Sequence, residues 1–93
     1  MPGTVQVRLP RPLLQYWDGP NTVDVEADTL QEALGNLDGR VPGLSARILD
    51  DQGLIRRHVA IFVNADLVEG SDPARVRLAP GDRVMIVPSV SGG

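Results

Sequence analysis

One segment of this 93-residue chain has the apolar spacing of a long amphipathic helix, and short segments with strand-like alternation lie on both sides of it. Four apolar residues recur at i, i+3, i+4 and i+7 and so share one helical face: Leu30, Ala33, Leu34 and Leu37. Thr29 and Glu32 have the spacing of a capping box, which predicts that the helix begins directly after Thr29. One such helix on one face of a small sheet is typical of an α+β domain.

The strand segments alternate between apolar and polar side chains or carry short apolar runs. They are residues 5–9, 23–26, 58–63, 67–68 and 83–87. The first two are expected to pair as a hairpin with a long loop. The simplest assembly then places the first and last strands side by side and parallel in the middle of a mixed sheet. The predicted fold class is therefore α+β with one main helix, in the β-grasp or ubiquitin-like arrangement.

The segments between the strands carry weaker signals. Gly35 either costs about 1 kcal/mol of helix propensity or allows close packing against the sheet, and Gly39 is expected to cap the helix C-terminus. Residues 13–17 are expected to form an apolar turn that closes one end of the core. Residues 42–47 are expected to form a short helical turn, and residues 54–57 an irregular strand.

Composition excludes several classes of protein. Without cysteine the chain has no disulfide, thiol nucleophile or thiolate metal site. Its net charge of -3 argues against nucleic-acid binding, and no apolar stretch approaches the roughly twenty residues that span a membrane. The start lacks the pattern of a secretory signal, so we expect a cytoplasmic protein. All nine basic residues are arginine, so no lysine side chain is available for linkage of the chain to itself.

Candidate catalytic residues are few. His58 stands beside Arg57 at a strand start, without a predicted partner that would make it a general base. Asp50 and Asp51 are adjacent in a glycine-containing turn, where carboxylates usually face water. The chain carries no phosphate-binding glycine-rich loop and no metal-ligand cluster. It is therefore not expected to be an enzyme in its own right.

The sequence ends in Gly92-Gly93, directly after the last predicted strand and a short break. Glycine lacks Cβ, so a diglycine can lie extended in a narrow channel with its carbonyl open to attack. A free α-carboxyl group is ionised at neutral pH and can attack a phosphoanhydride. We expect one domain over residues 1–93 with a flexible tail at 89–93, whose chemistry occurs at Gly93. The alternative is an ordinary frayed terminus.

The two later strands present apolar side chains on the face that the helix does not cover. If Val59, Ile61, Val63, Val84 and Ile86 point inward, then four apolar residues point outward: Ala60, Phe62, Met85 and Val87. A sheet with one helix layer normally has a polar open face, so these residues predict a docking patch beside the tail. The predicted partner-binding residues are Phe62, Met85, Val87, Val90 and Ser91. Central strands that tolerate such residues, or a covering loop, are the alternatives.

Three blocks resemble the MoaD/ThiS family of ubiquitin-like sulfur carriers: residues 29–34, 59–64 and 78–93. The last block joins a Gly-Asp turn, an alternating strand and the terminal diglycine at fixed spacing. The resemblance implies that a ubiquitin-activating-type enzyme adenylates Gly93, using ATP and magnesium that the chain itself does not bind. Sulfur then replaces AMP to form a thiocarboxylate, and a biosynthetic enzyme accepts that sulfur.

Within the family, residues 49–58 resemble the longer actinobacterial carriers, which include the CysO group that feeds cysteine synthesis. Cysteine or a specialised metabolite is therefore the expected destination of the sulfur. Pro88-Ser89 replaces the two consecutive prolines common in the family, which weakens the alternative of a molybdopterin-synthase small subunit. A modifier joined through Gly93 to lysines of other proteins remains open. So does a pure binding module, for which the diglycine would have no function.

Overall fold

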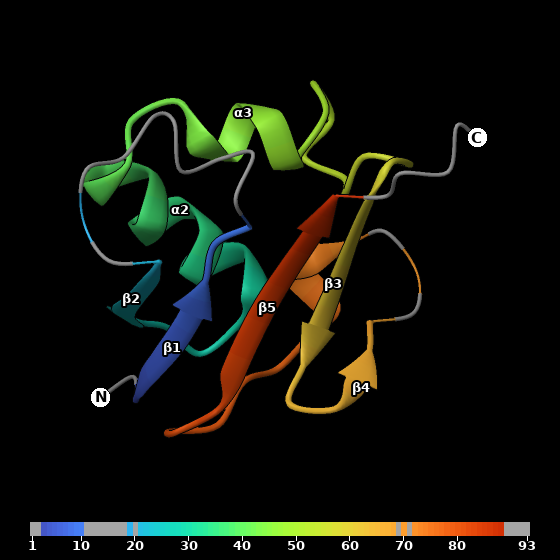
Figure 1. Ribbon diagram of the computed structural model, residues 1–93. Helices are drawn as coiled ribbons and strands as arrows, with labels where there is room; N and C mark the ends of the chain where they lie inside the picture. The colour runs from blue at the N-terminus through green and yellow to red at the C-terminus, as the bar shows by residue number, and fades with distance from the viewer. Residues whose placement is uncertain (1–2, 11–18, 20, 69, 71, 89–93) are drawn as a thin grey trace.

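The computed structural model describes residues 3–10, 19, 21–68, 70 and 72–88 of the chain (Figure 1). The elements follow in the order β1 (Thr4–Arg8), β2 (Thr22–Glu26), α2 (Leu30–Arg40), α3 (Leu44–Ile48), β3 (Val59–Val63), β4 (Asp66–Leu67), the 3-10 helix η1 (Pro73–Arg75) and β5 (Arg83–Pro88). The expected apolar turn at 13–17 and the expected tail at 89–93 lie outside the described residues.

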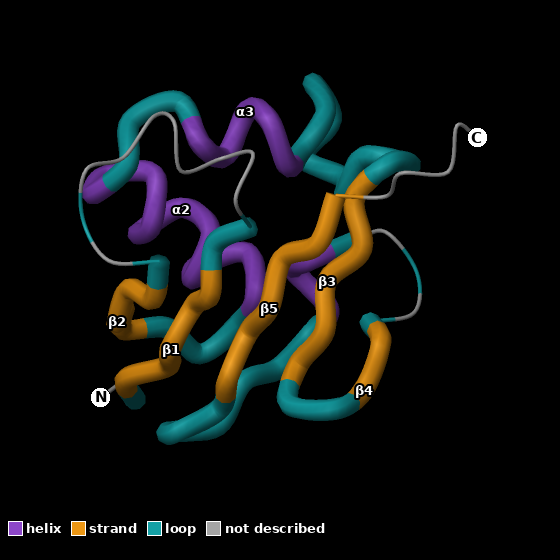
Figure 2. The backbone as a smooth tube through the Cα atoms, viewed as in Figure 1, coloured by secondary structure: helices purple, strands orange, loops and turns teal. Residues whose placement is uncertain are grey.

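The strands form one mixed sheet in the order β2-β1-β5-β3-β4. β1 and β5 are parallel and central, with Val7 opposite Val84, while β1 pairs with β2 and β3 pairs with β5 in antiparallel register. The helices lie behind the sheet in Figure 2, and the opposite face of the sheet is open. This topology confirms the predicted α+β class and the predicted central parallel pair.

The core lies between α2 and the sheet. Alternation in each strand and the helical repeat in α2 direct apolar side chains into this space. The core side chains include Val5, Val7, Val25, Leu30, Leu34, Leu37, Ile48, Ile61, Val84 and Ile86. Val59 and Val63 pack against the same cluster, so all five residues expected to point inward from β3 and β5 do so.

Helix α2 begins where the capping box predicts. The backbone N–H of Glu32 donates to Thr29 Oγ1 at 3.2 Å, and the Glu32 carboxylate accepts from the backbone N–H of Asp28 at 2.7 Å. These bonds satisfy donors that a helix start would otherwise leave unpaired. The start of the helix is thereby fixed at the end of the β1–β2 hairpin.

The same helix also covers the free edge of β2. Asn36 Nδ2 donates to the Glu26 carbonyl at 2.6 Å, and an Arg40 guanidinium nitrogen donates to the Asp24 carbonyl at 2.7 Å. An edge strand with unpaired carbonyls invites pairing with another chain. These two side chains occupy that edge, so β2 is held against α2 by polar contacts as well as by the core.

One expectation for α2 was wrong, and one of the two alternatives for Gly35 is excluded. The helix continues through Gly39 to Arg40, and Val41 is the C-terminal cap residue. Gly35 is exposed, and a Cβ added there would meet no atom within 4 Å, so this glycine does not serve close packing on the sheet. The segment after the helix is held by Asp38, whose carboxylate accepts from the backbone N–H groups of Gly43 and Ser45, both at 3.1 Å.

The strands also differ from expectation, each by one residue at one or both ends, and one expected strand is missing. β4 spans Asp66–Leu67, one residue earlier than expected, because the turn after β3 contains only two residues. The irregular strand expected at residues 54–57 is reduced to a single bridge between Leu49 and Ile55. Within the described part of the chain, none of the helices has the length and apolarity that crossing a bilayer requires.

Gly35→Ala is predicted to raise the free energy of unfolding by about 0.5–1 kcal/mol, because alanine loses less backbone entropy on entering a helix and meets no neighbour here. Urea denaturation followed by circular dichroism measures this change. Gly81→Ala is the matched control and should destabilise the fold, because Gly81 has φ +87°. A loss of stability in Gly35→Ala would contradict the assignment of open space beside that residue.

Candidate partner-binding site

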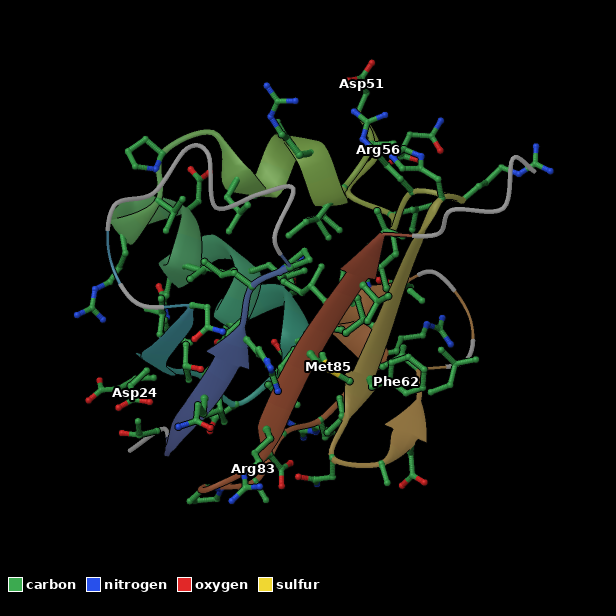
Figure 3. The ribbon with its side chains drawn as sticks, viewed as in Figure 1. Asp24, Asp51, Arg56, Phe62, Arg83 and Met85 are labelled. Atoms are coloured by element: carbon green, nitrogen blue, oxygen red, sulfur yellow. The ribbon has the colours of Figure 1, made fainter. Side chains whose placement is uncertain are left out.

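An apolar row crosses the open face of the sheet from β4 through β3 to β5. The register places Leu67 opposite Phe62, and Phe62 opposite Met85. Figure 3 shows Phe62 and Met85 beside each other on neighbouring strands. Directly opposed residues in antiparallel strands have Cβ atoms about 4.5–5.5 Å apart, so the three side chains form a continuous surface.

This surface is exposed rather than covered. Leu67 retains 54% and Met85 retains 37% of its full exposure, whereas the inward neighbour Ile61 retains 1%. Phe62 is half-buried. The alternative in which a loop covers the outward residues therefore fails for Leu67 and Met85. A second outward pair, Ala60 opposite Val87, extends the row toward the end of β5.

We call this surface the open-face patch, comprising Ala60, Phe62, Leu67, Met85 and Val87. Of these residues, sequence analysis missed Leu67. The signal for it was available, because a two-residue turn after Val63 places Leu67 opposite the outward Phe62. Pairing the two strands across that turn would have predicted Leu67 as a residue of the patch.

β5 leads from the patch directly toward the C-terminus. Its last residue, Pro88, lies opposite Val59, and the preceding Val87 lies opposite Ala60. The predicted site residues Val90, Ser91, Gly92 and Gly93 follow but lie outside the described residues, so their roles stay predictions.

Asn64 joins the two strands at the opposite end of the patch. Its φ of 57° is the left-handed conformation that asparagine tolerates well. Its side chain accepts from the backbone N–H of Arg83 at 3.1 Å and donates to Asp82 Oδ1 at 3.2 Å. Asp82 in turn accepts from the backbone N–H of Ala79 at 2.8 Å. This network fixes the end of β3 to the start of β5 and so sets the register of the patch.

The remaining candidate side chains form no reaction centre in the described part of the chain. Asp50 accepts from the backbone N–H groups of Gln52 and Leu54 at 2.9 and 3.0 Å, which makes it a turn residue. Asp51 and His58 are exposed. No group of three or more potential metal ligands occurs among the described residues.

Comparison with known proteins assigns the chain to a family. The sequence profile of the ThiS family matches residues 14–93, which is most of the chain and includes the sheet strands β2 to β5. This chain belongs to the ThiS family. The predicted resemblance to the MoaD/ThiS carriers is thereby confirmed.

Relatives of this ThiS-family chain include carriers and modifiers. The sulfur carrier protein CysO of Mycobacterium tuberculosis is 34% identical over 91 residues, which cover 96% of this chain and 98% of that protein. A crystal structure of the Amycolatopsis orientalis BexX/CysO complex contains a chain with a TM-score of 0.85 and 27% identity, covering 96% of this chain and 99% of that one. Small archaeal modifier protein 1 of Haloferax volcanii is 33% identical over 72 residues, covering 76% of this chain and 78% of that protein.

Asn64→Ala is predicted to lower the free energy of unfolding by about 1–3 kcal/mol, because alanine disfavours the left-handed conformation and removes the hydrogen bonds to Arg83 and Asp82. Asn64→Gly should cost less, because glycine keeps the conformation and loses only the hydrogen bonds. Chemical denaturation of both variants separates the two contributions. Equal losses would show that the backbone conformation of Asn64 carries no part of the effect.

Proposed function

We propose that this chain is a sulfur carrier whose Gly93 carboxyl group is adenylated and converted to a thiocarboxylate. The observation that carries the proposal is the path of β5, which runs along the exposed patch and ends at Pro88, five residues before the terminal glycine. An enzyme that docks on the patch would find the tail within reach of its active site. The carrier and modifier names of the relatives support this function.

The chemistry proceeds in two balanced steps. A Gly93 carboxylate oxygen attacks the α-phosphorus of ATP, and pyrophosphate leaves, which yields an acyl-adenylate. Sulfide then attacks the glycyl carbonyl carbon, and AMP leaves with the bonding electron pair, which yields the thiocarboxylate. A carboxylate is a poor electrophile, so the anhydride provides the leaving group that substitution by sulfur requires.

ATP and magnesium belong to the adenylating partner in this scheme, and the carrier acts as a protein cosubstrate. A biosynthetic enzyme is the second partner and accepts the sulfur. We assign the sulfur to cysteine or a specialised metabolite, supported by the CysO relatives of Mycobacterium and Amycolatopsis. ATP supply and reduced sulfur place the reaction in the cytoplasm.

The proposed chemistry predicts a change of mass at the C-terminus. After incubation with ATP, magnesium, sulfide and a ubiquitin-activating-type adenylating enzyme, intact mass spectrometry should show a gain of about 16 Da, because sulfur replaces one oxygen. Fragmentation should place the change on Gly93. A variant lacking Gly92 and Gly93 is the control and should remain folded but unmodified. No mass gain with an enzyme that forms the acyl-adenylate would overturn the sulfur-carrier assignment.

The proposed docking of the adenylating enzyme on the open-face patch predicts that a charge placed in the patch weakens binding. Met85→Glu should raise the KM of the adenylating enzyme for the carrier about tenfold or more, because a carboxylate would have to be desolvated inside an apolar contact. Gln31→Glu places the same charge on an exposed residue of α2, on the far side of the sheet from the patch, and is the matched control. Pyrophosphate exchange measures both variants. Equal KM values for Met85→Glu and the wild type would exclude the patch from the docking surface.

A protein modifier is the second candidate function. The Haloferax relative named small archaeal modifier protein 1 favours it, and the activated Gly93 would be the same intermediate. The difference is the nucleophile, which would be a lysine amine of another protein. Digestion with trypsin, which cuts after Arg83, and mass spectrometry of cell extracts would then find residues 84–93 of this chain attached to lysines, in place of the thiocarboxylate.

A further inference from the structure

Two arginines border the open-face patch on the side of β1. Arg8 lies directly opposite Met85 in the parallel pairing of β1 with β5. Arg83 lies two residues before Met85 on the same strand and therefore on the same face. Both side chains are exposed, and Figure 3 shows Arg83 at the start of β5 below Met85.

Neither guanidinium has a partner within the described part of the chain. The ion pair found in the described part of the chain joins Arg75, the last residue of η1, to Asp72. Arg40 and Arg56 donate hydrogen bonds to backbone carbonyls, so their side chains have structural roles. Arg8 and Arg83 make no such bond, and no ion pair joins either to Asp24, the acidic residue that lies opposite Gln6 on β1.

Along one row of paired residues across the sheet, the open face therefore changes from apolar to positively charged. Leu67, Phe62 and Met85 give an apolar stretch, and Arg8 continues the same row with a positive charge. Two positive charges with no partner among the described residues are notable beside an apolar patch, because the chain has a net charge of -3. Exposed charges that make no internal contact are available to a partner without loss of fold stability.

We infer that Arg8 and Arg83 form the polar border of the docking site and select a partner whose apolar pocket is edged by carboxylates. The inference rests on the proposed function, and the partner is the adenylating enzyme. Charge complementarity carries it, because a carboxylate-edged pocket can contact Met85 and both guanidinium groups together. Border charges of this kind mainly accelerate association and orient the encounter.

The test measures association kinetics at several salt concentrations. The probe is the adenylating enzyme that activates the wild-type chain, and the variant is Arg8→Gln combined with Arg83→Gln. Its association rate constant should fall about tenfold at low ionic strength, with a flatter salt dependence and a dissociation rate changed less than about threefold. Arg8→Glu combined with Arg83→Glu should slow association further, because carboxylates would then face carboxylates.

The matched control is Arg47→Gln combined with Gln31→Glu, which lowers the net charge by two, as the test variant does. Both residues are exposed and lie on α3 and α2, the helices behind the sheet in Figure 2. If the inference holds, this control keeps the wild-type rate and salt dependence. An equal loss in the control would show that net charge alone governs association and would overturn the role of Arg8 and Arg83.

Other outcomes distinguish this inference from the proposed function. Unchanged association and salt dependence in the Arg8 and Arg83 variant, with normal thiocarboxylate formation, overturns the inference alone. Failure of the wild-type chain to be activated by any adenylating enzyme overturns both. Sedimentation of the wild type as a dimer that the two substitutions dissociate would assign the arginines to a second copy of the chain and overturn the inference.

Discussion

The parallel pairing of β1 with β5 in the middle of the sheet is the constraint on which the rest of the structure depends. It places the first and last strands of the chain against the same helix and buries Val7 and Val84 as neighbours. The hairpin partner β2 then lies on one side, and β3 lies on the other. Because β5 is central, the residues that lead to the C-terminus begin in the most constrained part of the sheet.

The two faces of β5 lie in different surroundings. Val84 and Ile86 are buried against α2, whereas Met85 and Val87 belong to the open-face patch. A change of one residue in the strand register would exchange the two sets of side chains. The Asn64 network at the start of β5 therefore holds both the core and the open-face patch in place, since one register determines both.

Local patterns were sufficient for much of this architecture. Alternation located the strands, and Thr29 with Glu32 located the start of α2. The end of α2 was missed because Gly39 resembles a cap, whereas the carboxylate of Asp38 receives the N–H groups that follow the helix. The arginine border could not be predicted, because it depends on the register between β1 and β5, which are far apart in the sequence.

The position of β5 also determines how the fold responds to force. A partner that draws the tail into a narrow channel pulls β5 along its own axis. Its neighbours β1 and β3 are paired to it on both sides, so the backbone hydrogen bonds resist together in shear rather than opening one at a time. An edge strand in the same place would peel from the sheet. A pull on the end of β5 along its own axis thus leaves the folded domain intact.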